Sequence, residues 1–184
     1  MPTHAIIEPE GFATESLLII TGTMGAGKTT VLGEASDILR LRHISHAAID
    51  LDGLGLAHLP SEANNDGVMY RNLESVCANY TSHGVKRLLL ARAIENPAEL
   101  DLCRRAVSAT NTVLCRLTAS IETMQQRVKM RELGVSRREH VDRVVKLNAI
   151  LERVRLEDFT ITNENRSPIE TAHETLLKAG WISN

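Results

Sequence analysis

A glycine-rich run with the spacing G-x-x-x-x-G-K-[ST] occupies residues 22–29, Gly-Thr-Met-Gly-Ala-Gly-Lys-Thr. An apolar run, Leu17 to Ile20, precedes it, and an amphipathic stretch follows it. Glycines let the backbone adopt positive φ and approach an anion closely, so that several N–H groups point toward phosphate oxygens. Between a strand and a helix, this pattern indicates a phosphate-binding loop. The sequence therefore predicts a site for a nucleoside triphosphate, either ATP or GTP.

Two side chains at the end of this loop add chemistry to its backbone. Lys28 would reach the β- and γ-phosphates as a point charge, and the Thr29 hydroxyl would ligate Mg²⁺. A helix beginning near Lys28 would add its unpaired N–H groups and the positive end of its dipole. The alternative is a glycine-rich turn that only joins a strand to a helix. The residues expected to contact the nucleotide are Gly22, Met24, Gly25, Ala26, Gly27, Lys28, Thr29 and Thr30.

Two aspartates, Asp50 and Asp52, follow a short apolar segment at 47–49 that is predicted to be a strand. The carboxyl ends of parallel strands are where ligands bind in open α/β sheets. Transfer of a phosphoryl group to an alcohol needs one carboxylate near the attacking hydroxyl and oxygen ligands for Mg²⁺. Two aspartates one residue apart can divide these roles between them. An Asp-Gly turn with solvated carboxylates is the simpler alternative.

Two pairs of arginines are further candidates. Arg71, in a predicted helix at 66–80, and Arg92, after a predicted strand at 85–91, would bind a carboxylate or phosphate of the acceptor. Arg127 and Arg131 are four residues apart on one helix face, in a segment at about 127–140 that would close as a lid. Either would contact the nucleotide and neutralise charge on the transferring phosphoryl group. Ordinary surface charge explains all four equally simply.

Composition excludes several classes of protein. The chain has 184 residues, a net charge of −2 and 3% aromatic residues, which argues against nucleic-acid binding. Three cysteines without C-x-x-C spacing predict buried reduced thiols. No apolar run approaches the ~20 residues that span a bilayer, and no signal segment is evident. We therefore expect a cytoplasmic protein with no membrane partner, while the composition leaves its oligomeric state open.

Strand and helix patterns alternate along the chain after a loose, flexible arm at 1–15. Apolar runs predict strands at 17–20, 47–50, 85–91, 112–117 and 159–162. Helix starts are predicted from Asn96-Pro97, from Ser120, and from capping boxes at 136–139 and 167–170. This alternation predicts a single α/β domain at 16–184, with a five-stranded parallel sheet, helices on both faces in three layers, and a small lid.

With these motifs the chain resembles the nucleoside-monophosphate-kinase-like branch of P-loop proteins, which holds shikimate, gluconate and adenylylsulfate kinases and chloramphenicol phosphotransferase. The 22–29 loop is close to that of shikimate kinase, and Asp50-Leu51-Asp52 resembles its D-x-D element. The resemblance implies Asp50 near magnesium, Asp52 near the acceptor, Arg71 on the substrate, and Arg127 and Arg131 in a lid. The segments 116–120 and 166–181 look like small kinase-like proteins of actinobacterial type.

The chain departs from the shikimate kinase pattern after its third predicted strand. Shikimate kinase has a glycine triplet there, whereas this chain has Ala91-Arg92-Ala93, which argues against shikimate as the acceptor. That strand also lacks a terminal aspartate, so Asp50 would serve the metal instead. The sequence favours a small-molecule kinase acting on a metabolite, nucleoside or antibiotic. A nucleotide-binding protein without kinase activity, such as a sensor or a ligand-sequestering resistance factor, is the alternative.

Overall fold

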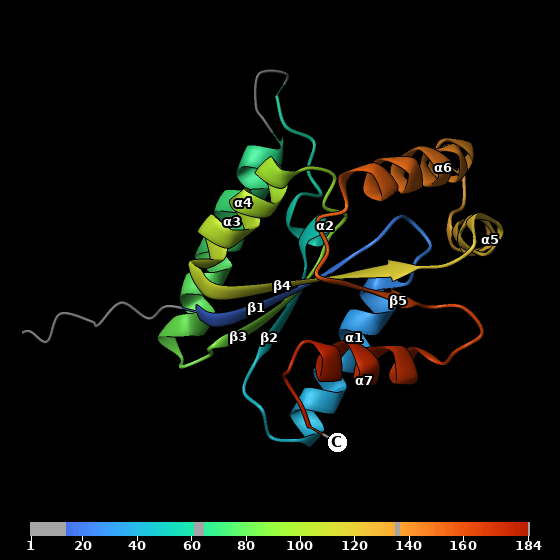
Figure 1. The fold of residues 1–184 in the computed structure, drawn as a ribbon. Helices are drawn as coiled ribbons and strands as arrows, with labels where there is room; N and C mark the ends of the chain where they lie inside the picture. Colours follow the sequence, from blue (N-terminus) through green and yellow to red (C-terminus); the bar gives the residue numbers. More distant parts are fainter. Residues whose placement is uncertain (1–13, 61–64, 135–136, 184) are drawn as a thin grey trace, which may run out of the picture.

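A twisted sheet of five parallel strands forms the centre of the molecule in a computed structural model that describes residues 14–60, 65–134 and 137–183 (Figure 1). The strand order is β2-β3-β1-β4-β5, and every strand pair is parallel. The strands are β1 (Thr14–Thr21), β2 (Ala47–Asp50), β3 (Arg87–Ala91), β4 (Ala109–Thr118) and β5 (Phe159–Thr162). The predicted parallel α/β sheet is therefore confirmed.

Helices cover both faces of the sheet, which gives the three predicted layers (Figure 1). They are α1 (Lys28–Leu41), α2 (Leu51–Leu54), α3 (Asn65–Ser82), α4 (Pro97–Val107), α5 (Ile121–Arg131), α6 (Arg137–Val154) and α7 (Pro168–Lys178). Successive side chains of β1 point to opposite faces of the sheet, so they contribute to two separate hydrophobic cores. Leu18 and Ile20 pack with α1, α5 and α7, whereas Leu17 and Ile19 pack with α3 and α4.

Strand ends differ from the predicted ones where tertiary pairing extends or shortens a run. β1 begins at Thr14, which is buried and pairs in register with Ala109, so the predicted arm is too long by two residues. β3 begins at Arg87 because the Val85 amide instead donates to Tyr80 O in the turn after α3. The four-residue helix α2 was not among the predicted elements.

Helix starts agree with the sequence where side-chain caps were predicted. Asn96, Ser120 and Ser167 each accept a hydrogen bond from a backbone amide of the first helical turn, and Ser167 with Glu170 forms a full capping box. Ser136, the predicted cap of α6, lies outside the described residues. Among the described ranges, no helix combines the length and apolar composition required to cross a bilayer.

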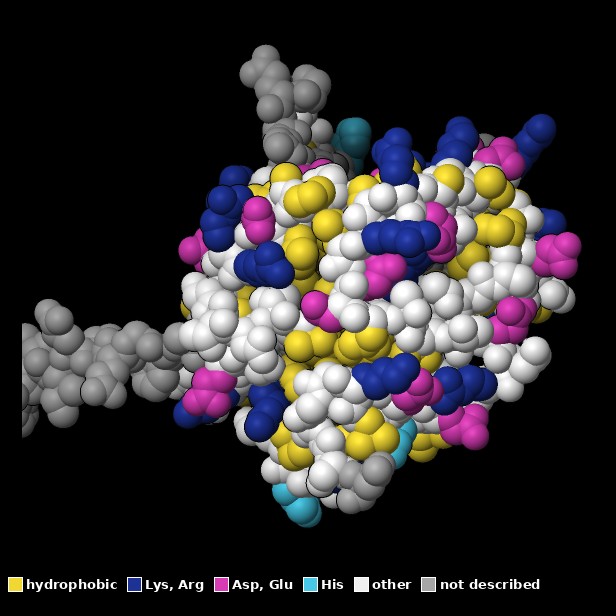
Figure 2. All heavy atoms as spheres, viewed as in Figure 1, with side chains coloured by type: hydrophobic (Ala, Val, Ile, Leu, Met, Phe, Trp, Pro, Cys, Tyr) yellow, Lys and Arg dark blue, Asp and Glu magenta, His cyan; other side chains and the backbone are white. Residues whose placement is uncertain are grey.

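The cysteines and the surface charge also agree with the composition. Cys77, Cys103 and Cys115 are buried and unpaired, as predicted. Burial raises the pKa of Cys103 to about 11 and that of Cys115 to about 12. Basic and acidic side chains are interspersed over the face shown in Figure 2, so this face carries no extended basic field for a nucleic-acid backbone.

Candidate phosphate-binding site

The loop between β1 and α1 has a backbone that glycine alone adopts easily. Gly25 and Gly27 have φ of 78° and 97°, in the left-handed region that disfavours other residues. A Cβ at Gly25 would lie 2.3 Å from Met124 O, and one at Gly27 would lie 2.3 Å from Asn163 Nδ2. The loop is therefore shaped by backbone conformation and by close neighbours from α5 and from the segment after β5.

A small cavity of about 110 Å³ lies at this loop, where a polyphosphate would enter. Its lining brings together several of the residues predicted from the sequence: Met24, Gly25, Gly27, Lys28, Thr29, Thr30, Asp52 and Arg131. Backbone amides at the start of α1 and two cations thus border one space. This arrangement suits a polyanion.

Lys28 lies inside the loop, with its Nζ donating to Thr23 O at 3.2 Å. Burial lowers the pKa of Lys28 below its ordinary value, and the carboxylates of Asp52 and Asp50 partly oppose that shift. The neighbouring guanidinium of Arg131 lowers this pKa further. The cost of burying the charged ammonium is therefore only partly offset in the free protein. An anionic ligand would stabilise the charged form.

Asp50 and Thr29 meet at the carboxyl edge of the sheet. Thr29 Oγ1 donates to Asp50 Oδ2 at 2.6 Å, although 21 residues separate them. The other carboxylate oxygen of Asp50 accepts the Asp52 amide at 3.2 Å and caps α2. A hydroxyl and a carboxylate oxygen are the hard donors that Mg²⁺ prefers, with phosphate oxygens and waters completing its shell. These two residues therefore fit a magnesium ion.

Asp52 and Arg92 form an ion pair beside the cavity, through Asp52 Oδ1 and Arg92 Nη1. Arg92 Nη2 also lies 3.8 Å from Asp66 Oδ1 at the start of α3. The Asp52 side chain is 62% exposed, whereas that of Arg92 is 23% exposed. Arg92 therefore reaches the predicted edge of the site, but its charge is shared between two carboxylates.

Arg71 lies apart from the phosphate-binding loop. It is exposed on α3 and lines a different cavity, of about 370 Å³, between α3 and α4. Glu74 and Arg105 line this second cavity as well. The structure therefore groups Lys28, Thr29, Asp50, Asp52, Arg92 and Arg131. Arg71 lines the other cavity together with Asp66, whose carboxylate lies 3.8 Å from Arg92, so its role toward an acceptor stays a prediction.

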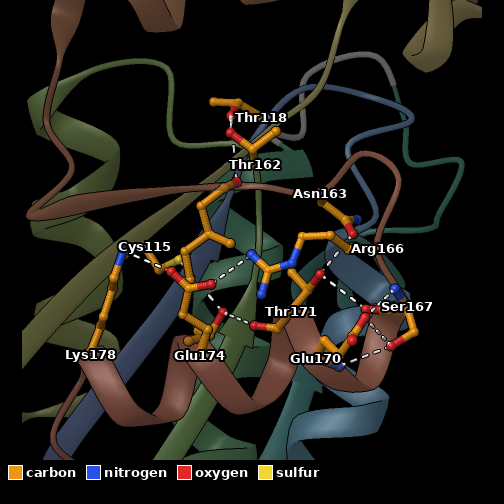
Figure 3. Close-up of polar contacts among 12 residues, drawn as sticks. Cys115, Thr118, Thr162, Asn163, Arg166, Ser167, Glu170, Thr171, Glu174 and Lys178 are labelled. Carbon is orange, nitrogen blue, oxygen red and sulfur yellow. Dashed lines mark hydrogen bonds and ion pairs between the residues drawn. The ribbon is translucent and has the colours of Figure 1, made fainter.

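Arg127 contacts backbone carbonyls of two loops. Its Nη1 donates to Gly25 O at 3.2 Å, and its Nη2 donates to Asn163 O at 2.9 Å. The buried Asn163 side chain donates to Ala26 O at 2.8 Å and accepts from Thr171 Oγ1 at 3.0 Å. Figure 3 shows Asn163 directed toward Thr171 on α7. Arg127 and Asn163 thus brace the phosphate-binding loop from α5 and from the β5–α7 segment.

Structural comparison identifies proteins with the same arrangement of elements. A tunicamycin resistance protein from Deinococcus radiodurans has a TM-score of 0.62 and 13% identity, covering 91% of this chain and 97% of that one. An APS kinase from Mycobacterium tuberculosis, in complex with AMPPNP and APS, has a TM-score of 0.61 and 19% identity, with coverages of 91% and 98%. A sugar kinase from Janibacter sp. HTCC2649 has a TM-score of 0.60 and 16% identity, with coverages of 91% and 96%.

The chain has a P-loop kinase-like fold. No protein-family model and no curated protein matches its sequence. Identities below 20% show a shared fold and leave the reaction to be argued from the site.

Several residues that support the P-loop were missed by sequence reasoning. Asn163 is one of them, because its local sequence is equally typical of a plain turn between a strand and a helix. Thr23 Oγ1 donates to Val144 O on α6 at 3.4 Å, and Glu164 accepts from Ser120 Oγ at 2.7 Å. These contacts join segments 44 and 121 residues apart, so no local spacing in the sequence indicates them.

Proposed function

We propose that this protein is a phosphotransferase that moves the γ-phosphate of ATP or GTP to a hydroxyl of a small molecule. The observation that carries the proposal is the hydrogen bond from Thr29 to Asp50 at 2.6 Å, beside a cavity lined by Lys28 and Asp52. Together these residues would combine a triphosphate site, a metal site and a carboxylate, that of Asp52, which is 62% exposed and paired with Arg92. The likeness to a sugar kinase and to an APS kinase supports the same reaction class.

The nucleotide side of the site would be formed by the P-loop. Loop amides and the Lys28 ammonium would bind the β- and γ-phosphates, with the start of α1 adding its dipole. Thr29 and Asp50 would hold Mg²⁺, which supplies neutralisation of phosphate charge when bound. Arg131, whose side chain is 61% exposed, would move from its partner Glu132 toward the γ-phosphate.

The acceptor side would be formed around Asp52. The acceptor hydroxyl oxygen attacks the γ-phosphorus as the bond to the bridging oxygen breaks, and the hydroxyl proton passes to the Asp52 carboxylate. The products are a phosphate ester and the nucleoside diphosphate. Asp52 orients the hydroxyl and the cations neutralise charge, so catalysis would rest on positioning and electrostatics. We assign Arg127 a positioning role through the P-loop carbonyls.

A second candidate function is nucleotide binding without phosphotransfer. Two observations favour it: Arg92 already pairs with Asp52, and β3 ends in Ala91 without a carboxylate. In that case Asp52 would only anchor Arg92. The two candidates differ in what the Asp52 carboxylate does during a turnover.

Replacing Asp52 with Asn separates these candidates. With the acceptor that supports nucleotide consumption in a panel of sugars, nucleosides and amino alcohols, we expect D52N to lower kcat by about 10²- to 10⁴-fold. Its affinity for the nucleotide should stay within about twofold. D37N, which removes an exposed carboxylate from α1, is the matched control and should keep wild-type turnover. Equal turnover of D52N and wild type would contradict the kinase proposal.

A further inference from the structure

We propose that Glu132 is a latch for Arg131, a carboxylate that holds this arginine in the nucleotide-free protein and gives it up to the γ-phosphate of a bound nucleotide. Glu132 is then a positioning residue, because it acts on the nucleotide only through Arg131. It sets how strongly the site prefers a triphosphate to the diphosphate product. This inference rests on the proposed function, since it assigns a regulatory contact to the same nucleotide site.

The two oxygens of the Glu132 carboxylate face different partners. Oε1 accepts from Arg131 Nε at 3.2 Å and from Arg131 Nη2 at 2.9 Å. Oε2 lies 3.3 Å from His140 Nδ1 in the first turn of α6. Glu132 is also the C-cap of α5, and its backbone amide donates to Val128 O at 2.9 Å. The base of the latch is therefore fixed at a helix end between two side-chain partners.

Burial differs between these partners in the way that a latch requires. The side chain of Glu132 is 22% exposed, whereas that of Arg131 is 61% exposed and can change rotamer without disturbing the core. His140 Nδ1 is buried and makes no hydrogen bond among the described residues. A buried ring nitrogen without a partner is costly. Its Nδ1–H form would recover that cost if Glu132 turned toward it after Arg131 had left.

Arg131 already stands at the place where a γ-phosphate would enter. It lines the phosphate cavity together with Lys28. Burial is the main cause of the lowered pKa of Lys28, and the charge of Arg131 lowers that pKa further. The two cations thus repel each other when no phosphate separates them, and Glu132 offsets the charge of one of them.

The latch itself is ionised. The hydrogen bond from Arg131 is the largest cause that holds the pKa of Glu132 below its ordinary value. A γ-phosphate beside Lys28 carries more negative charge than this carboxylate and would compete with it for the guanidinium. Release of Arg131 then exchanges one anionic partner for another, while Glu132 keeps His140. A diphosphate has no γ-phosphate to offer, so Arg131 returns to Glu132 once the phosphoryl group has been transferred.

The test compares nucleotides with and without a γ-phosphate. The Mg²⁺ complexes of AMPPNP and ADP, and of GMPPNP and GDP, are titrated calorimetrically into wild type and E132Q. The measured quantity is the affinity for the triphosphate analogue divided by the affinity for its diphosphate. We expect E132Q to raise this ratio by about two- to fivefold, the range of an exposed ion pair. The reason is that Arg131 then meets the γ-phosphate without a competing carboxylate.

Two further variants separate a latch from a simple change of charge. In an R131M background, E132Q should leave the ratio unchanged, because no arginine remains to be released. E122Q removes an exposed carboxylate from the first turn of the same helix. It is the matched control and should also leave the ratio at its wild-type value.

The inference would be overturned by an unchanged ratio in E132Q, or by a lower one, which would mean that Glu132 directs Arg131 onto the phosphate. An equal rise in the R131M background would also overturn it, because the effect would then come from the lost negative charge alone. Each of these results leaves the kinase proposal standing. Conversely, wild-type turnover by D52N would refute the kinase proposal without changing the effect of E132Q. No saturable binding of either nucleotide pair would overturn the latch together with the triphosphate site.

Discussion

At the scale of single residues, the charge of Lys28 affects both the stability of the free protein and its affinity for a nucleotide. Its ammonium donates to Thr23 O and lies near both carboxylates and guanidinium groups, and burial is the largest cause of its lowered pKa. The charged form is disfavoured in the free protein, so the folded state binds protons less readily than the unfolded chain. Between the lowered pKa and the ordinary lysine value, the stability of the free protein should therefore rise with pH.

Nucleotide binding should reverse this balance, because a triphosphate favours the charged ammonium. We predict that binding takes up protons in the same pH window, and that affinity falls as pH rises through the lowered pKa. Calorimetry in buffers of different ionisation enthalpy measures this uptake directly. K28M should remove it, and an unchanged uptake in K28M would assign the proton to another group.

At the scale of elements, α5 presents two arginines with different surroundings. Arg127 is half-buried and donates to the carbonyls of Gly25 and Asn163, whereas Arg131 is exposed and borders the phosphate cavity. The sequence placed both on one helix face and treated them alike as lid arginines. Only the packing of α5 against the P-loop separates their roles.

We predict that substitution of each arginine by methionine affects a different property. R127M should lower the free energy of unfolding by about 1 to 3 kcal/mol, because it leaves loop carbonyls without a charged donor. R131M should change stability by less than about 0.5 kcal/mol yet lower kcat by roughly tenfold or more. Chemical denaturation and steady-state kinetics measure the two effects. A large loss of stability in R131M, or none in R127M, would reverse these assignments.

Helix α6 is fixed at its C-terminal half by a buried cation. Arg116 on β4 is 2% exposed and pairs with Glu152 at 2.7 Å, and it also contacts Asn148 and Glu157. Val144 meets the P-loop through Thr23. Any closure of the predicted lid at 127–140 would therefore involve the N-terminal end of α6. The lid itself stays a prediction, since residues 135 and 136 lie outside the described ranges.

At the scale of the whole molecule, the sequence predicted most of what local patterns encode. The alternation of apolar strand runs with helical patterns predicted the parallel sheet. The capping residues Asn96, Ser120 and Ser167 predicted three helix starts. The glycine-rich loop placed Lys28 and Thr29, and the strand end placed Asp50 beside them. These features depend on residue type and short spacing, which a single sequence displays.

Other features depend on how distant segments meet, and the sequence alone did not reveal them. Asn163 reaches Ala26 across 137 residues, and Arg92 is held by Asp52 because β2 and β3 are neighbours in the sheet. Arg71 was placed with the acceptor because its helix follows Asp50 in sequence. In three dimensions it lines the α3–α4 cavity beside Asp66, whose carboxylate approaches Arg92.

The central claim is that the P-loop amides and Lys28 bind the triphosphate of a nucleotide with Mg²⁺. Calorimetric titration of ATP or GTP in the presence of Mg²⁺ into wild-type protein and K28M tests it most directly. Saturable binding by the wild type and a loss of at least about thirtyfold in K28M are expected, because a phosphate charge loses its buried partner. K86M, which removes an exposed lysine paired with Glu15, should bind as the wild type does. No binding by the wild type to either nucleotide, or equal binding by K28M, would contradict the account.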